Sequence, residues 1–183
     1  MEDCTLRTIE NFEELETVLK KASETNHPNA KNFLVDKMHK RWNNYLQFSL
    51  LEHKDEIISF AGIYKYGDNL VRVADRLFTF EKFRQTALTK KVIEKLRPAV
   101  DYFIPSQTRW AKQNGFECFY SIGANKKRRA MERVASLLDP TLGYEVLPGY
   151  YATCNPKLPK CWQTIASTTK KINLPSKLDV EFV

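Results

Sequence analysis

The sequence lacks the features that mark secreted, zinc-binding and membrane-spanning proteins. Its four cysteines, Cys4, Cys118, Cys154 and Cys161, form no CxxC pair, and no histidine follows Cys154 to complete a zinc set. We interpret all four as free thiols in a reducing compartment and expect no metal site. The chain has no run of about 18 apolar residues, and its acidic N-terminus has no apolar signal core. These absences predict a cytoplasmic protein without a membrane partner.

Internal repeats and low-complexity segments are also missing. The 183 residues suit one domain that can bury a core without disulfides. Lys and Arg outnumber Asp and Glu by 29 to 22, and the net charge of +7 favours anionic partners or, alternatively, a solvated basic surface. We expect residues 1–166 to form the domain and residues 167–183 to be a polar, basic C-terminal arm.

Hydrophobic periodicity predicts two helices near the N-terminus. Asn11 is an N-cap residue with Glu14 three positions later, as in a capping box, so the first helix should begin there. A second helix should follow Asn29 and stop at Asn43–Asn44. Its apolar stripe comprises Ala30, Phe33, Leu34, Met38 and Trp42. Period-two patterns predict strands at Cys4–Ile9, Tyr45–Glu52, Glu56–Tyr66 and Leu70–Phe80. Short connections make the last three an antiparallel meander.

Prolines interrupt the helical pattern in the second half. Pro98 and Pro105 each remove a backbone donor, so we expect two helical pieces, Thr89–Leu96 and Pro105–Asn114. The remaining predicted elements are a buried strand at Phe116–Ile122, a helix with core residues Met131, Val134, Ala135 and Leu138, and strands at Tyr144–Leu147, Tyr150–Cys154 and Cys161–Ala166. A meander followed by strand–helix units implies an α/β (α+β) fold, with a mixed, mostly antiparallel sheet and helices on both faces.

Two segments stand at informative places in this order. Arg84–Gln85–Thr86–Ala87–Leu88–Thr89 follows the meander, and Asn125 opens the helix after the buried strand. With the element order over residues 4 to 166, they resemble the GNAT superfamily of acyl-CoA-dependent N-acyltransferases, in the divergent style of phage-encoded members. The resemblance implies transfer of an acetyl or short acyl group from acetyl-CoA, as acyl-donor cosubstrate, to an amine by direct attack. A phage origin would place the protein in the host cytoplasm.

The resemblance also assigns the cofactor site. In that family a turn of pattern Q/R-x-x-G-x-G/A opens a helix whose backbone N–H groups hold the pyrophosphate. Arg84 matches its first position, whereas Ala87 and Thr89 replace the small residues and no glycine is present. Asn125 would bond the pantetheine or cap its helix.

The fourth strand has a second role in that family. It splays from the fifth strand, and its free backbone groups pair with the pantetheine arm. Leu77, Phe78, Thr79 and Phe80 are the residues at those places in this sequence.

The family's chemistry needs a proton acceptor for the amine and a proton donor for the leaving thiolate. Asp75 is the candidate base, and its neighbours Arg72 and Arg76 suggest the alternative of a paired structural carboxylate. Many relatives carry a donor tyrosine on the following helix, which is missing here. Tyr120, Ser121 or water are therefore the candidate donors.

The alternative function is a non-catalytic binding protein on the same scaffold. The missing glycines and helix tyrosine favour it, as does the basic run Lys126–Lys127–Arg128–Arg129. That run would contact a CoA phosphate, a nucleic-acid backbone, or only solvent. Nucleic acid or a cellular protein would then be the partner. No pattern predicts an acceptor or an oligomeric state.

Overall fold

The computed structural model describes residues 4–27, 30–83, 97–123, 128–147, 151–152 and 162–169. The strands are β1 (Cys4–Ile9), β2 (Tyr45–His53), β3 (Glu56–Lys65), β4 (Leu70–Thr79), β5 (Glu117–Gly123), β6 (Glu145–Val146), β7 (Tyr151–Ala152) and β8 (Trp162–Ser167). The α-helices are α1 (Phe12–Ser23), α2 (Val35–Arg41), α4 (Ile104–Gln113) and α5 (Arg128–Leu137). Shorter helical turns are the 3-10 turns Ala30–Phe33, Trp42–Asn44 and Pro140–Leu142 and the π turn Pro98–Phe103.

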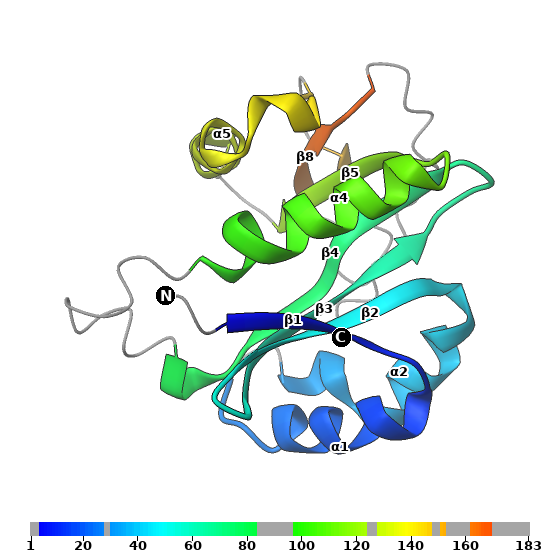
Figure 1. Cartoon of the computed structure of the whole chain (residues 1–183), viewed down its shortest axis with the longest axis vertical. Coiled ribbons are helices and arrows are strands. Elements are labelled where there is room, and N and C mark those ends of the chain that lie inside the picture. Colours follow the sequence, from blue (N-terminus) through cyan, green and yellow to red (C-terminus); the bar gives the residue numbers. More distant parts are fainter. Residues whose placement is uncertain are drawn as a thin grey trace.

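These strands form one eight-stranded sheet in the order β1-β2-β3-β4-β5-β8-β6, with β7 also paired to β8. Neighbouring strands are antiparallel except β4 and β5, which are parallel. Helices α1 and α2 cover one face, and α4 and α5 lie on the other (Figure 1). The predicted mixed, mostly antiparallel sheet with helices on both faces is confirmed.

Helix α1 begins as predicted. The Asn11 side chain accepts a hydrogen bond from the backbone N–H of Glu14 at 3.0 Å. The helix buries Leu15 and Leu19 against a core whose largest members are phenylalanines of β2, β3 and β4. The cap and the apolar spacing together fix where the helix starts and which face it buries.

The predicted second helix is broken at Leu34. Leu34 therefore does not belong to the buried apolar stripe in which the sequence pattern placed it. Leu34 has an extended backbone with ψ of 133°, and it is 43% exposed. Phe33 and Met38 are five residues apart, so one straight helix would turn them about 140° from each other. The break lets both side chains enter the same core cluster.

The predicted break at Pro105 does not occur. The Ile104 N–H donates to the carbonyl of Ala99, five residues back, and the π turn from Pro98 runs directly into α4. The donor that Pro105 lacks falls in the first turn of α4, where proline is tolerated. The helical backbone therefore begins at Pro98. The other predicted piece, Thr89–Leu96, lies outside the described residues.

The predicted C-terminal strands pair antiparallel, with β8 as the long strand. Val146 of β6 lies opposite Ala166, and Tyr151 of β7 lies opposite Gln163. The two short strands thus act as one interrupted strand beside β8. The domain boundary after Ala166 stays a prediction.

Two β-bulges make β4 irregular on both sides of Asp75. From Arg72 to Asp75 the strand advances three residues while β3 advances two, and the same happens from Asp75 to Phe78. In a regular strand, residues three apart point to opposite faces. The bulges instead turn all three side chains toward α1 and α2, where Phe78 joins the core and Asp75 reaches Arg41.

A buried glutamine holds the first bulge. Ala74 and Arg76 have φ of 52° and 53°, a left-handed conformation that costs non-glycine residues about 1–3 kcal/mol each. Gln107 of α4 is fully buried, and its Oε1 accepts from the Ala74 N–H at 2.7 Å. Its Nε2 donates to the carbonyl of Ala61 at 3.1 Å. One amide therefore ties α4 to both β3 and β4.

Replacing Gly62 with alanine is expected to lower the free energy of unfolding by about 1–3 kcal/mol. A Cβ at Gly62 would lie 2.5 Å from Tyr45 Cδ1 and 2.6 Å from Phe48 Cδ2, so it would clash with both rings. Urea denaturation measures the change. Gly67→Ala is the control, because nothing lies within 4 Å of a Cβ there. Equal midpoints for both variants would contradict the expected clash.

Candidate active site

The central strands β4 and β5 separate partway along the sheet. Three residue pairs join them, the last being Arg72–Phe119, and no later pair joins them in the described part of the chain. Both strands nevertheless continue, to Thr79 and Gly123. Leu77 lies on β4 beyond the last pair and is 37% exposed, although its strand is central. The sheet is therefore open at its centre, as the predicted parallel, diverging pair requires.

Asp75 lies beside this opening with its carboxylate already engaged. It is 1% exposed, and its Oδ1 is 3.2 Å from Nη1 of Arg72. Its Oδ2 accepts a hydrogen bond from the Tyr45 hydroxyl at 2.5 Å and lies 3.8 Å from Nη2 of Arg41. The predicted pairing with arginine is confirmed for Arg72. Because both carboxylate oxygens are already engaged, an amine or a water molecule would have to share Asp75 with these partners.

Aromatic rings surround the charged groups on this face. The Arg41 guanidinium lies over the Tyr64 ring, 4.3 Å from its centroid, and the Tyr66 ring is 5.2 Å from that of Phe119. Burial, and then the Asp75 charge, raise the pKa of Tyr45 well above its usual value, so its hydroxyl stays a donor.

Two donors of this cluster have no hydrogen-bond partner among the described residues: Nε of Arg72 and the hydroxyl of Tyr66. Burial raises the pKa of Tyr66, and the nearby Arg72 guanidinium counteracts part of that rise. Burial disfavours the charged form of Arg72, yet the Asp75 carboxylate and Tyr66 raise its pKa, so it is a cation. Unpartnered buried donors cost free energy, and they mark a place where an acceptor would be stabilised.

The two predicted proton donors point to opposite faces of β5. Tyr120 is buried under α4 and α5, with its ring 4.9 Å from that of Tyr144. Ser121, the next residue, is on the face shared by Phe119 and the Asp75 cluster. Neither hydroxyl has a hydrogen-bond partner within the described ranges. Burial raises the pKa of Tyr120, so it is protonated.

The predicted cofactor residues divide into two groups. Leu77, Phe78 and Thr79 lie on β4 beyond its last pair with β5. The Phe78 side chain is 2% exposed and packs in the core, so only its backbone is placed to meet a ligand. The others, Arg84 to Thr89 and Asn125, lie outside the described residues, as do Lys126 and Lys127.

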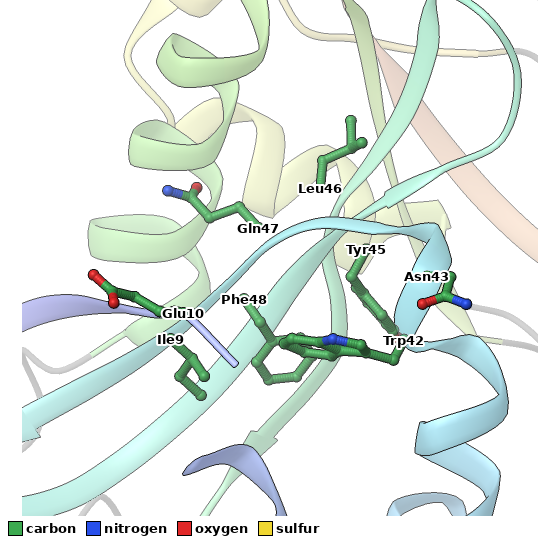
Figure 2. A pocket seen from close by; sticks show the side chains of 8 residues that line it. All are labelled: Ile9, Glu10, Trp42, Asn43, Tyr45, Leu46, Gln47 and Phe48. Carbon is green, nitrogen blue, oxygen red and sulfur yellow. The ribbon is translucent and has the colours of Figure 1, made fainter. Parts of the chain in front are cut away.

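A separate pocket of about 300 Å³ lies where β1 ends and β2 begins (Figure 2). It is lined by Ile9, Glu10, Trp42, Asn43, Tyr45, Leu46, Gln47 and Phe48. Tyr45 links it to the cluster, because its ring lines the pocket while its hydroxyl binds Asp75. None of these lining residues belongs to β4 or β5, so the pocket is distinct from the opening.

Other kinds of site receive no support from the described residues. They contain no group of three His, Cys, Asp or Glu side chains that could hold a metal ion. No helix among them combines the length and hydrophobicity needed to cross a bilayer. Cys4 and Cys118 are free thiols, as predicted, and burial raises the pKa of Cys118 to about 12.

Sequence reasoning missed Arg41, Tyr45, Tyr66 and Gln107. Gln107 did leave a signal, because it lies with Ile104 and Ala111 on one apolar helical face, where a polar residue needs a buried partner. Nothing comparable marks Arg41, Tyr45 or Tyr66. Tyr45 and Tyr66 are brought to Asp75 and Arg72 by the pairing of β2, β3 and β4, and Arg41 reaches Asp75 from the end of α2.

Neither a family model nor a curated protein matches this chain in sequence. Solved structures do resemble it. An N-acetyltransferase from Staphylococcus aureus Mu50 is 12% identical with a TM-score of 0.55, covering 90% of this chain and 96% of that one. The ribosomal-protein-S18-alanine N-acetyltransferase from Escherichia coli is 9% identical with a TM-score of 0.52, covering 98% of both.

A third structure carries a ligand. It is a GNAT family acetyltransferase from Elizabethkingia anophelis with acetyl-CoA bound, 9% identical, with a TM-score of 0.50 and coverage of 91% of this chain and 98% of that one. At such identities the likeness concerns the fold, and the phage-like character stays a prediction. The shared architecture and the parting of β4 from β5 lead to one assignment: this chain has the fold of the GNAT superfamily of acetyltransferases.

Proposed function

We propose that this protein is an N-acyltransferase that moves an acetyl or short acyl group from acyl-CoA to an amine. The observation that carries the proposal is the opening between β4 and β5. Backbone groups in the middle of a sheet are normally paired, and here the adjoining strand has turned away beyond Arg72–Phe119. An extended chain with amide groups, such as pantetheine, can pair with the exposed edge. The GNAT-fold relative with acetyl-CoA bound supports this choice of ligand.

The proposed roles follow the order of the chain. Leu77, Phe78 and Thr79 pair with the pantetheine through their backbone. The segment Arg84–Thr89 after β4 holds the pyrophosphate, and Asn125 after β5 bonds the pantetheine or caps its helix. A β4 backbone N–H near Leu77 or Phe78 polarises the thioester carbonyl as the neutral amine attacks.

Proton transfer completes the reaction. The amine's proton must leave, and the expelled CoA thiolate must receive one. Asp75 is the proposed acceptor, through water, because its own oxygens are held by Arg72 and Tyr45. Ser121 and Tyr120 are the proposed donors. Single Ser121→Ala and Tyr120→Phe variants separate the two. Replacing the residue that donates the proton should lower kcat without changing acetyl-CoA affinity.

Acetyl-CoA and free CoA are expected to raise the thermal midpoint of the purified protein, because a ligand of the folded state stabilises it. Ala87→Asp would place a negative charge where the pyrophosphate is proposed to bind. It should weaken acetyl-CoA binding by at least about 1–2 kcal/mol through repulsion in a partly dehydrated site. Isothermal titration with the wild-type protein and the variant measures the difference.

The matched control is Thr17→Asp, which adds the same charge to the exposed side of α1. It should leave acetyl-CoA affinity unchanged. If wild-type protein shows no response to acetyl-CoA or CoA, the proposed function is wrong. If both ligands bind and Ala87→Asp binds them equally well, the pyrophosphate lies elsewhere.

A further inference from the structure

Positive charge gathers at the point where β4 and β5 part. Arg72 belongs to the last pair between the strands, and Arg41 reaches the same place from the end of α2. Both guanidinium groups bind the carboxylate of Asp75, so two positive charges face one negative charge. Both arginine side chains are nearly buried, 13% exposed for Arg41 and 12% for Arg72, where water screens charge poorly.

The Arg72 guanidinium has unused donor capacity. Its Nη1 binds Asp75, while its Nε–H has no partner among the described residues. The Tyr66 hydroxyl lies beside the Arg72 side chain, and its own O–H donates to no acceptor among the described residues. An arginine Nε–H and a phenol hydroxyl are suited to the oxygens of a carboxylate or phosphate.

Within the described part of the chain, Arg72 has an Nε–H without a partner, and the Tyr66 hydroxyl beside it has no acceptor, where β4 and β5 part. From this juxtaposition we propose that the acceptor amine carries an anionic group, which Arg72 and Tyr66 bind. The inference rests on the proposed acyl transfer for the amine itself, whereas the anion site can be tested without CoA. A bound carboxylate or phosphate would satisfy both donors and balance the excess positive charge.

The same charges argue against a purely cationic acceptor. An ammonium group without a neighbouring anion would meet two guanidinium groups and one carboxylate that is already engaged. Like charges in a site with little water repel strongly. The cations would also favour the neutral form of a bound amine, which is the form that attacks a thioester. One cluster can thus select an anionic acceptor and help to deprotonate it.

The test compares matched probes that differ in charge. L-alanine and L-phenylalanine are each paired with their C-terminal amides, and O-phosphoethanolamine is paired with ethanolamine. Binding to the free protein is measured by ligand-observed NMR, because the amides differ in amine acidity and rates would mix the two effects. We expect the member that carries a carboxylate or phosphate, in at least one set, to bind about tenfold or more tightly than its partner. The set that responds tells a carboxylate from a phosphate.

Two variants test the residues. Tyr66→Phe removes a buried hydroxyl that donates to no described acceptor, so the thermal midpoint should stay the same or rise, while the preference for the probe with the anionic group falls severalfold. Arg72→Lys keeps the positive charge but loses the planar set of N–H donors. It should reduce the preference for a probe with an anionic group further. Arg97→Gln, at an exposed ion pair with Asp101, is the control and should change nothing.

Three results would overturn the inference. Probes with a carboxylate or phosphate could bind no better than their partners without one, the preference could survive both Tyr66→Phe and Arg72→Lys, or only oligonucleotides could bind. If the Arg72 variant fails to fold, Tyr66→Phe decides alone. Anion binding without any acetyl-CoA binding would retain the anion site and reject the proposed acyl transfer, so the two failures are distinguishable.

Discussion

Asp75→Ala is expected to lower the free energy of unfolding by about 3–5 kcal/mol, because removing one partner of a buried ion pair leaves the others uncompensated. The substitution would leave Arg72 and Arg41 facing each other without the carboxylate that both bind. It would also deprive the Tyr45 hydroxyl of its acceptor. Chemical denaturation with an unchanged m-value measures the loss.

Asp75→Asn refines this result. The amide oxygen can still accept from Tyr45, but the negative charge is gone. The free energy of unfolding of Asp75→Asn should therefore lie between the values for wild type and Asp75→Ala. Asp68→Ala removes a carboxylate from the exposed turn before β4 and should change stability little. If Asp75→Ala unfolds within about 1 kcal/mol of wild type, the cluster is not a buried, mutually dependent network.

The sequence predicts the position of β4 but not the direction of its side chains. Alternating apolar residues located the strand, and its bounds differ from the prediction by one residue, Phe80. Alternation cannot reveal bulges, because an inserted residue changes which face each side chain occupies without changing composition. A regular strand would have separated Arg72 from Asp75. Their pairing was predicted as an alternative, but its geometry depends on the bulge between them.

The start of a helix can depend on residues nearby in the sequence, whereas a break in a helix can depend on packing against distant residues. The Asn11 cap of α1 acts over three residues and was predictable. The break at Leu34 depends on where the core needs Phe33 and Met38, which only the packed sheet defines. Likewise Tyr45 reaches Asp75 because β2, β3 and β4 pair with their particular register shifts, and Arg41 reaches it from the end of α2. The candidate site was therefore predictable at Asp75, and its partners were not.

Gln107→Leu is expected to lower the free energy of unfolding by about 2–4 kcal/mol, since it leaves two buried backbone groups without partners. These are the Ala74 N–H and the carbonyl of Ala61. Ala74 keeps its left-handed backbone only while its surroundings hold it. Relaxation of that bulge would move Asp75 away from Arg72, so acetyl-CoA turnover should fall even where the variant is folded.

Gln107→Glu tests the same clamp through pH. A carboxylate could accept from Ala74 but not donate to Ala61, and burial would favour its protonated form, which can do both. Its folded-state pKa would then exceed the unfolded value of about 4.3. The variant should approach wild-type stability below that pH and lose stability as pH rises through the folded pKa. Gln113→Glu, exposed at the end of α4, should show no such dependence. Parallel pH profiles for the two variants would show that the hydrogen bond which Gln107 donates to Ala61 does not contribute to the clamp.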